Sequence, residues 1–121
     1  MNQVQRVAFN KEISLAKEFI AQGELDTGFT HLERAHVIGQ AFVFPHTLTH
    51  WLMLKLAWQR RQPAAAFGQL IRIFLGALGS AIGSVPVGNT GGTDISMFKR
   101  LPIAPELQRI IDGEVPPDVQ A

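Results

Sequence analysis

Four side chains that could bind a metal ion lie within a short stretch of this sequence. Glu33 and His36 are three residues apart, and His46 and His50 are four residues apart. Either spacing places two side chains on one face of a helix, about one turn apart. Two helices joined by a short connection are antiparallel neighbours, so the end of the first faces the start of the second. We therefore expect Glu33, His36, His46 and His50 to converge.

Three imidazoles and one carboxylate favour a transition metal, namely iron, zinc, manganese, nickel or copper, over calcium or magnesium, which prefer oxygen ligands. The sequence has no cysteine, so thiolate ligands are excluded. If only the histidines bind, Glu33 is free to act as a base on a metal-bound water. Glu18 could reach the same interior and act as a ligand of a second metal ion. A complete carboxylate-bridged di-iron site, however, needs two Glu-x-x-His pairs, and only a homodimer could provide the second pair. The metal-free interpretation is a set of buried histidines satisfied by hydrogen bonds.

The elements that must position these side chains are all predicted to be helices. Asn10 is the expected N-cap of the first, and glycine or proline residues separate the segments. The predicted fold is all-α, with two antiparallel helical hairpins forming a four-helix bundle, a glycine-rich loop and a short C-terminal helix. We expect one domain over 1–121, with its core at about 10–112 and a flexible tail at 114–121. The predicted helices cover residues 10–23, 25–38, 45–61, 63–82 and 105–113.

The apolar stretch 70–87 raises the question of a membrane span. Arg72 lies within it, and three glycines and Pro86 interrupt its far end, short of the ~20 apolar residues that a span requires. We interpret it as a buried helix. The N-terminal residues lack the apolar run of a signal peptide, which predicts a cytoplasmic location and no membrane partner. The formal net charge is only +1, and the charged residues are scattered along the chain rather than collected in a basic stripe. Both features argue against a nucleic-acid partner.

A second candidate site is the loop that contains Gly88, Asn89, Thr90, Gly91 and Gly92. Glycines let the backbone turn several N–H groups toward one point, and such a loop can bind a phosphate or a carboxylate. It is not a P-loop, because no Gly-Lys-Ser/Thr follows. The competing interpretation is a turn that takes the chain back across the bundle.

Several of these motifs together resemble a bacterial family of about 120 residues that is classed as a domain of unknown function. The resemblance runs from about residue 12 to residue 111, and it implies a small all-helical protein with no established activity. Relatives commonly have Met-Pro-Ile-Pro where this sequence has Leu-Pro-Ile-Ala at 101–104. The motifs that carry the resemblance are Leu-Glu-Arg-Ala-His at 32–36, His46 and His50, Gly-Gln at 68–69, Val-Pro-Val-Gly-Asn-Thr-Gly-Gly at 85–92 and Leu-Pro-Ile-Ala-Pro at 101–105.

The sequence thus predicts a small metal-binding protein that acts in metal handling or sensing. One alternative is a metal-free helical interaction module, in which Gly76, Gly79 and Gly83 or the first hairpin form the partner surface. A third is a metal-dependent enzyme of unknown reaction, for which no catalytic residue is identified. A homodimer is compatible with each of these.

Overall fold

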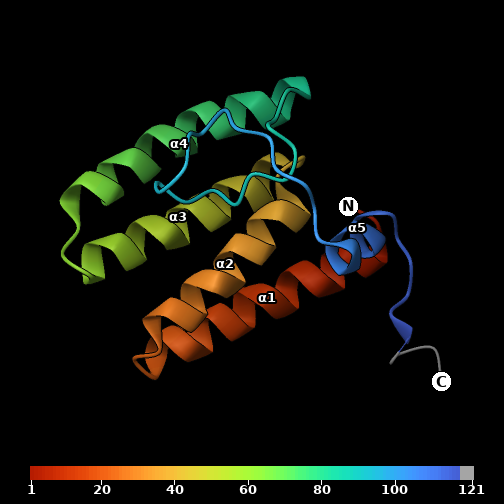
Figure 1. The fold of residues 1–121 in the computed structure, drawn as a ribbon, viewed down its shortest axis with the longest axis horizontal. Coiled ribbons are helices and arrows are strands. Elements are labelled where there is room, and N and C mark those ends of the chain that lie inside the picture. Colours follow the sequence, from red (N-terminus) through yellow and green to blue (C-terminus); the bar gives the residue numbers. More distant parts are fainter. Residues whose placement is uncertain (118–121) are drawn as a thin grey trace.

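Five helices make up the computed structural model, which describes residues 1–117. Within these residues there is no strand, so the predicted all-α fold with two antiparallel hairpins is confirmed. The first hairpin pairs α1 with α2, the second pairs α3 with α4, and α2 packs against α3 between them (Figure 1). Of the predicted tail at 114–121, residues 118–121 lie outside the described part of the chain. The helices are α1 (Gln3–Ala21), α2 (Leu25–Gly39), α3 (Val43–Gln59), α4 (Pro63–Ile82) and α5 (Pro105–Ile111).

The predicted start of the first helix at Asn10 is wrong, because α1 begins seven residues earlier. Asn2 is the N-cap, and its side chain accepts a hydrogen bond from the backbone N–H of Gln5 at 2.7 Å. The Gln5 side chain accepts one in return from the backbone N–H of Asn2. This reciprocal capping box satisfies two N–H groups that the helix itself leaves unpaired. Asn10 therefore lies inside α1, on its exposed face.

The core lies between the first hairpin and α3. Apolar residues at helical spacing on α1 and α2 face each other, and α3 and α5 close the two sides. This packing fixes the end of α2 against the start of α3, where the candidate ligands lie. The buried core residues include Phe9, Ile13, Ala16, Leu32, Ala35, Ile38, Met53, Leu56 and Leu107.

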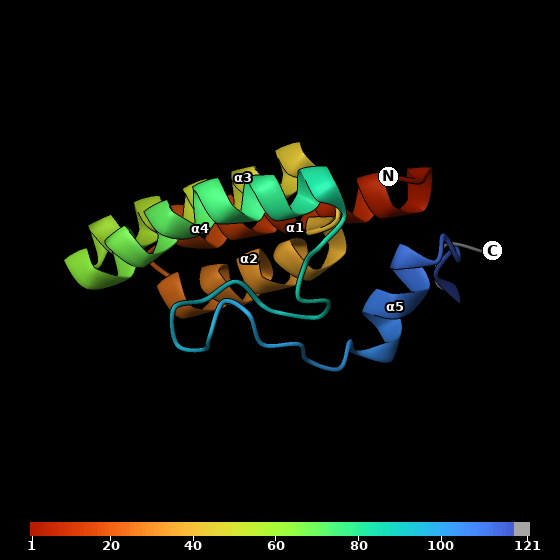
Figure 2. The same ribbon diagram turned by 90° about the horizontal axis from the view of Figure 1, so that it is seen from above.

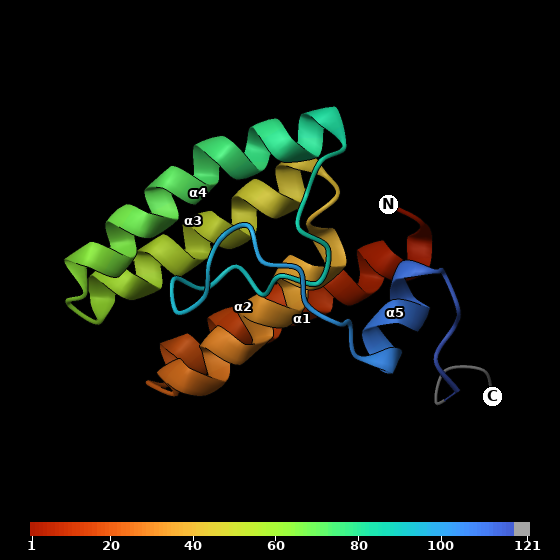
Figure 3. The ribbon, with the colours of Figure 1, turned by 45° about the horizontal axis from the view of Figure 1, so that its top comes forward.

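The helix α4 packs against α3 alone among the helices. The segment between α4 and α5 runs back across α2, α3 and α4, as predicted for this loop (Figures 2 and 3). Loop and helix meet where Gly92 approaches Phe29 of α2 and Thr93 approaches Gly68 of α4. The loop therefore takes the place of a helix on this side of the second hairpin.

The prediction that α4 is buried is wrong, since only Ala66, Gln69 and Ser80 of this helix are buried. Its apolar arc is broad, but one helix and a loop cover only part of it. Within the described residues, α4 is the one helix with the length and composition to cross a membrane, a test that buried core helices of soluble proteins also pass. The exposed apolar residues of α4 are Phe67, Leu70, Ile71, Phe74, Leu75, Leu78 and Ile82.

Candidate metal centre

Three buried histidines lie close together at the junction of α2 and α3. His36 is near the end of α2, and His46 and His50 are one turn apart at the start of α3. The Nε2 atom of His50 is 3.1 Å from the Nε2 atoms of both His36 and His46. No ring is more than 3% exposed. We call these three residues the histidine triad; each offers a ring nitrogen, and these nitrogens lie within 4.8 Å of one another.

The other ring nitrogen of each histidine is held by a partner outside the triad. His36 Nδ1 is 2.7 Å from the backbone oxygen of Asn89 in the glycine-rich loop. His46 Nδ1 is 2.7 Å from Ser80 Oγ, and His50 Nδ1 is 2.7 Å from Gln69 Oε1, both on α4. The loop and α4 thus orient all three rings, as outer partners commonly do for histidines that bind metals.

These partners determine which nitrogen of each ring carries the proton. The backbone oxygen of Asn89 can only accept, so His36 Nδ1 donates to it. The Gln69 side-chain amide donates to the backbone oxygen of Gly91 at 3.0 Å, which leaves Gln69 Oε1 as acceptor for His50 Nδ1.

For His46 the same conclusion follows from the partner of Ser80. The single Ser80 hydroxyl proton is donated to the backbone oxygen of Gln40 at 2.6 Å, so Ser80 Oγ accepts from His46 Nδ1. A neutral imidazole has one N–H, and the contacts with Asn89, Ser80 and Gln69 place it at Nδ1 in each ring of the triad. The backbone of Gly76 is a second acceptor for the His46 ring. All three Nε2 atoms carry bare lone pairs.

The rings are not protonated at neutral pH, so no Nε2–H is present to donate to a neighbouring lone pair. Burial lowers the pKa of His46 and of His50 to about 4, and hydrogen bonds to Gly76 and Gln69 oppose this only in part. Burial, followed by the neighbouring His50 and His46, lowers the pKa of His36 well below its usual value. At neutral pH the triad is therefore three neutral rings whose acceptor nitrogens face one another.

The separation of the lone pairs matches that of metal ligands. Two nitrogens that bind one tetrahedral ion at 2.0–2.1 Å are about 3.3 Å apart. The two Nε2 pairs with His50 are 3.1 Å apart and have no proton between them. Three nitrogens so placed could hold one cation, and imidazole ligands suit zinc and the other divalent transition metals.

Two glycines give the rings room. A Cβ atom on Gly91 would lie 2.6 Å from Cδ2 of His36, and the φ of Gly91 is +87°, a conformation that side chains other than glycine rarely adopt. A Cβ atom on Gly76 would lie 2.9 Å from Cε1 of His46. In the interaction-module alternative Gly76, Gly79 and Gly83 or the first hairpin form a partner surface. Gly76 faces His46 and Gly79 faces Ser84, whereas nothing lies within 4 Å of a Cβ atom added at Gly83.

The predicted carboxylate ligands lie outside the triad's group of nitrogens. Glu33 is half-buried, and its pKa is raised by burial and by the nearby Asp94, while a hydrogen bond with Thr90 opposes the shift. Glu18 is on an exposed position of α1. A metal role for Glu33 or Glu18 stays a prediction, whereas the structure brings the three histidines together.

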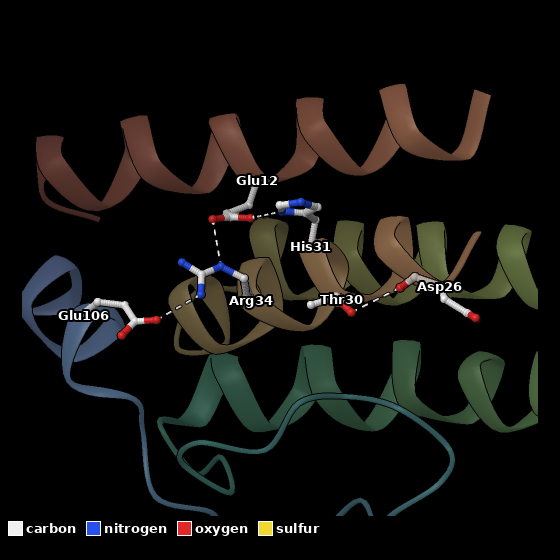
Figure 4. A network of polar contacts seen from close by, with 6 residues as sticks. All are labelled: Glu12, Asp26, Thr30, His31, Arg34 and Glu106. Carbon is white, nitrogen blue, oxygen red and sulfur yellow. Dashed lines mark hydrogen bonds and ion pairs between the residues drawn. The ribbon is translucent and has the colours of Figure 1, made fainter. Parts of the chain in front are cut away.

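His31, the remaining histidine of the sequence, lies apart from the triad. Its Nδ1 is 2.6 Å from Glu12 of α1, and its ring stacks on Phe19. Glu12 also accepts from Arg34, which reaches on to Glu106 of α5 (Figure 4). We call Glu12, His31, Arg34 and Glu106 the surface network.

The glycine-rich loop uses several of its N–H groups internally. Gly88 N–H donates to the Gln40 side chain, Asn89 N–H to the backbone of Pro86, and Gly91 N–H to the Asn89 side chain. Anion binding by Gly88, Asn89, Thr90, Gly91 and Gly92 stays a prediction. What the structure adds is that this loop positions His36 through Asn89 and His50 through Gly91 and Gln69.

Sequence reasoning did not identify Gln69 and Ser80 as part of the site. The available signal was their polarity: both are on α4, a helix that is otherwise strongly apolar, and both are nearly fully buried. A buried amide or hydroxyl in such a helix needs a polar partner. The signal did not say which partner, because the histidines are on another helix.

Comparison with known proteins identifies the chain's family. Residues 3–111 match the model of the family described as "Protein of unknown function (DUF3703)", and the chain belongs to this family. No curated protein and no solved structure matches the chain.

Proposed function

We propose that this protein binds one transition-metal ion through the Nε2 atoms of His36, His46 and His50, and that it acts in metal handling or sensing. The observation that carries the proposal is the contact pattern of the rings: Nδ1 of each buried ring faces an oxygen outside the triad that accepts from it, so the three Nε2 lone pairs converge. Such a group of acceptors is unfavourable by itself and is satisfied by a cation.

The donor set also limits the ion. Three neutral imidazoles suit zinc, copper, nickel, iron or manganese. The rings come from α2 and α3 and pack against α4 and the loop, so they would need little rearrangement to bind an ion. A bound ion would polarise whatever ligand takes its remaining position. His36, His46 and His50 would hold the ion, and Asn89, Ser80 and Gln69 would keep the rings oriented.

The test is metal stoichiometry after reconstitution of the untagged chain with Co²⁺ or Zn²⁺ and removal of excess ion. We expect about one ion per chain in the wild type and in His31→Gln, and none in the double variant His46→Gln/His50→Gln. His31→Gln is the matched control because it removes a histidine from the same helix, α2, outside the triad. An equal metal content in the double variant, or none in the wild type, would overturn the proposal and favour the metal-free interaction module.

A second measurement does not depend on the folding of the double variant. An ion that binds only the folded wild type at 100 times its Kd stabilises it by about 2.7 kcal/mol, which raises Tm by about 10 °C for a chain of this size. A chelator should reverse the shift. No shift with any of the five candidate metals would also contradict the proposal.

A further inference from the structure

A cavity opens beside the triad. Its volume is about 90 Å³, the space of roughly three water molecules. All three triad histidines line it, together with Arg72 and mainly apolar residues such as Leu75, Met97 and Phe98. An ion on the triad would therefore have room on the cavity side for a further ligand of a few heavy atoms.

Arg72 is the charged group of this cavity, and its side chain is held in place. Its two terminal nitrogens donate to the backbone oxygens of Gly68 and Ile95, each at 3.1 Å. Its Nε is buried and has no hydrogen-bond partner among residues 1–117. This nitrogen has almost no accessible surface, so what Arg72 offers to a ligand in the cavity is the charge of its guanidinium group rather than this N–H.

The charges around the cavity are unbalanced. Within the described residues no carboxylate lines it, and the carboxylate that acts on Arg72 from nearby is Asp94. The Arg72 charge is close enough to the triad to lower the pKa of both His36 and His50. A divalent ion on three neutral imidazoles would add two further positive charges, and buried charges need a counter-charge.

We propose that the remaining ligand of the bound ion is a small carboxylate-type oxyanion of three or four heavy atoms, which occupies this cavity and pairs with the guanidinium charge of Arg72. This inference rests on the proposed metal site. Its size follows from the volume of the cavity, and its negative charge follows from the ion and from Arg72. The apolar remainder of the cavity disfavours larger or more polar ligands.

The test uses the full chain loaded with Co²⁺ and follows the visible absorption bands of the ion. Titration with sodium formate at constant ionic strength should shift these bands with saturation, while formamide, of the same size but neutral, should not. Arg72→Gln should keep its cobalt and bind formate at least tenfold more weakly. Arg60→Gln should behave as the wild type; Arg60 also has a buried Nε without a partner among the described residues, but it pairs with Asp26 and does not line this cavity.

The outcomes separate the two proposals. A chain that binds no cobalt would overturn the metal site and the anion site with it. Cobalt bound at full stoichiometry with bands that formate does not move, or that formamide moves equally, would overturn the anion site alone. Equal formate affinity in Arg72→Gln and the wild type would show that Arg72 is not its partner and would also overturn it.

Discussion

The surface network and the triad each contain a histidine of α2, His31 and His36, and the hydrogen bonding of the two groups differs in kind. In the surface network, His31 and Arg34 both face the carboxylate of Glu12, so each donor has an anionic acceptor (Figure 4). In the triad, every outward acceptor is neutral: a backbone oxygen, an amide and a hydroxyl. The inner Nε2 atoms lie beside one another, and among residues 1–117 no N–H or O–H group donates to them.

The difference shows how to separate a structural histidine from a ligand. A carboxylate partner makes an ion pair that is complete within the chain, and such pairs occur widely on protein surfaces. Neutral acceptors fix the ring and its proton without supplying charge, so the free nitrogen stays basic and pointed at one place. The surface network therefore needs nothing further, whereas the triad is a set of acceptors without a donor.

Acid should destabilise the metal-free triad strongly, and this is the largest effect that we expect. The pKa of His46 and of His50 is about 4 in the folded chain, against an ordinary value of 6.5. The unfolded chain binds more protons between these values, so stability falls as pH decreases from 6.5 toward 4. At pH 5 the loss is about 2 kcal/mol for each of the two residues.

The measurement is urea unfolding in the presence of a chelator at pH 7.5 and pH 5. His46→Gln/His50→Gln should lose much less stability between these conditions than the wild type. An equal loss in both proteins would mean that the triad is not the origin of the acid sensitivity. Adding metal to the wild type should raise the free energy of unfolding at pH 7.5 and raise it less at pH 5, because protons compete with the metal for the same nitrogens.

Gly91→Ala should lower both stability and metal affinity, whereas a glycine substitution in the first hairpin should lower stability alone, and by less. At Gly91 a methyl group would meet the His36 ring at 2.6 Å, on a backbone with φ +87°. The left-handed backbone and the overlap together cost about 3 kcal/mol. Displacement of the ring should also weaken metal binding at least tenfold.

Gly23→Ala is the matched control. Gly23 has nearly the same φ, +82°, but no atom lies within 4 Å of the added methyl group. It should cost about 1 kcal/mol through the backbone alone and leave metal affinity unchanged. Thermal unfolding and a metal titration of both variants measure the two effects, and a Gly91→Ala variant with wild-type affinity would show that the loop does not hold His36 in position.

Much of this arrangement follows from local signals in the sequence. Pro63 marks the first residue of α4, and Gly83 follows its last residue with φ +74°. The spacing of His46 and His50, four residues on one helix, places both rings on one face. These features depend on neighbours in the chain, and the sequence predicts them for that reason.

Other features depend on contacts between distant segments and were not predictable. The partner of His36 is Asn89, 53 residues away, and the partner of His46 is Ser80, 34 residues away. Glu33 has suitable spacing from His36, but the loop brings Asp94 and Thr90 to its carboxylate. The exposure of α4 likewise reflects how few elements cover it, which its own apolar pattern does not reveal.

Glu12→Gln should lower stability modestly and leave metal binding unchanged. This is the smallest effect that we expect to distinguish the surface network from the triad. Glu12 is 8% exposed and accepts from His31 and Arg34. A glutamine keeps one acceptor but turns an NH₂ group toward one of the two donors, which costs about 1–2 kcal/mol. Glu106→Gln is the control, since the Glu106 side chain is 62% exposed and its pair with Arg34 contributes about 0–1 kcal/mol. If Glu12→Gln lowered the metal content, the loss of a charge on α1 would have affected the triad rings through α2. The surface network and the triad would then be one coupled system.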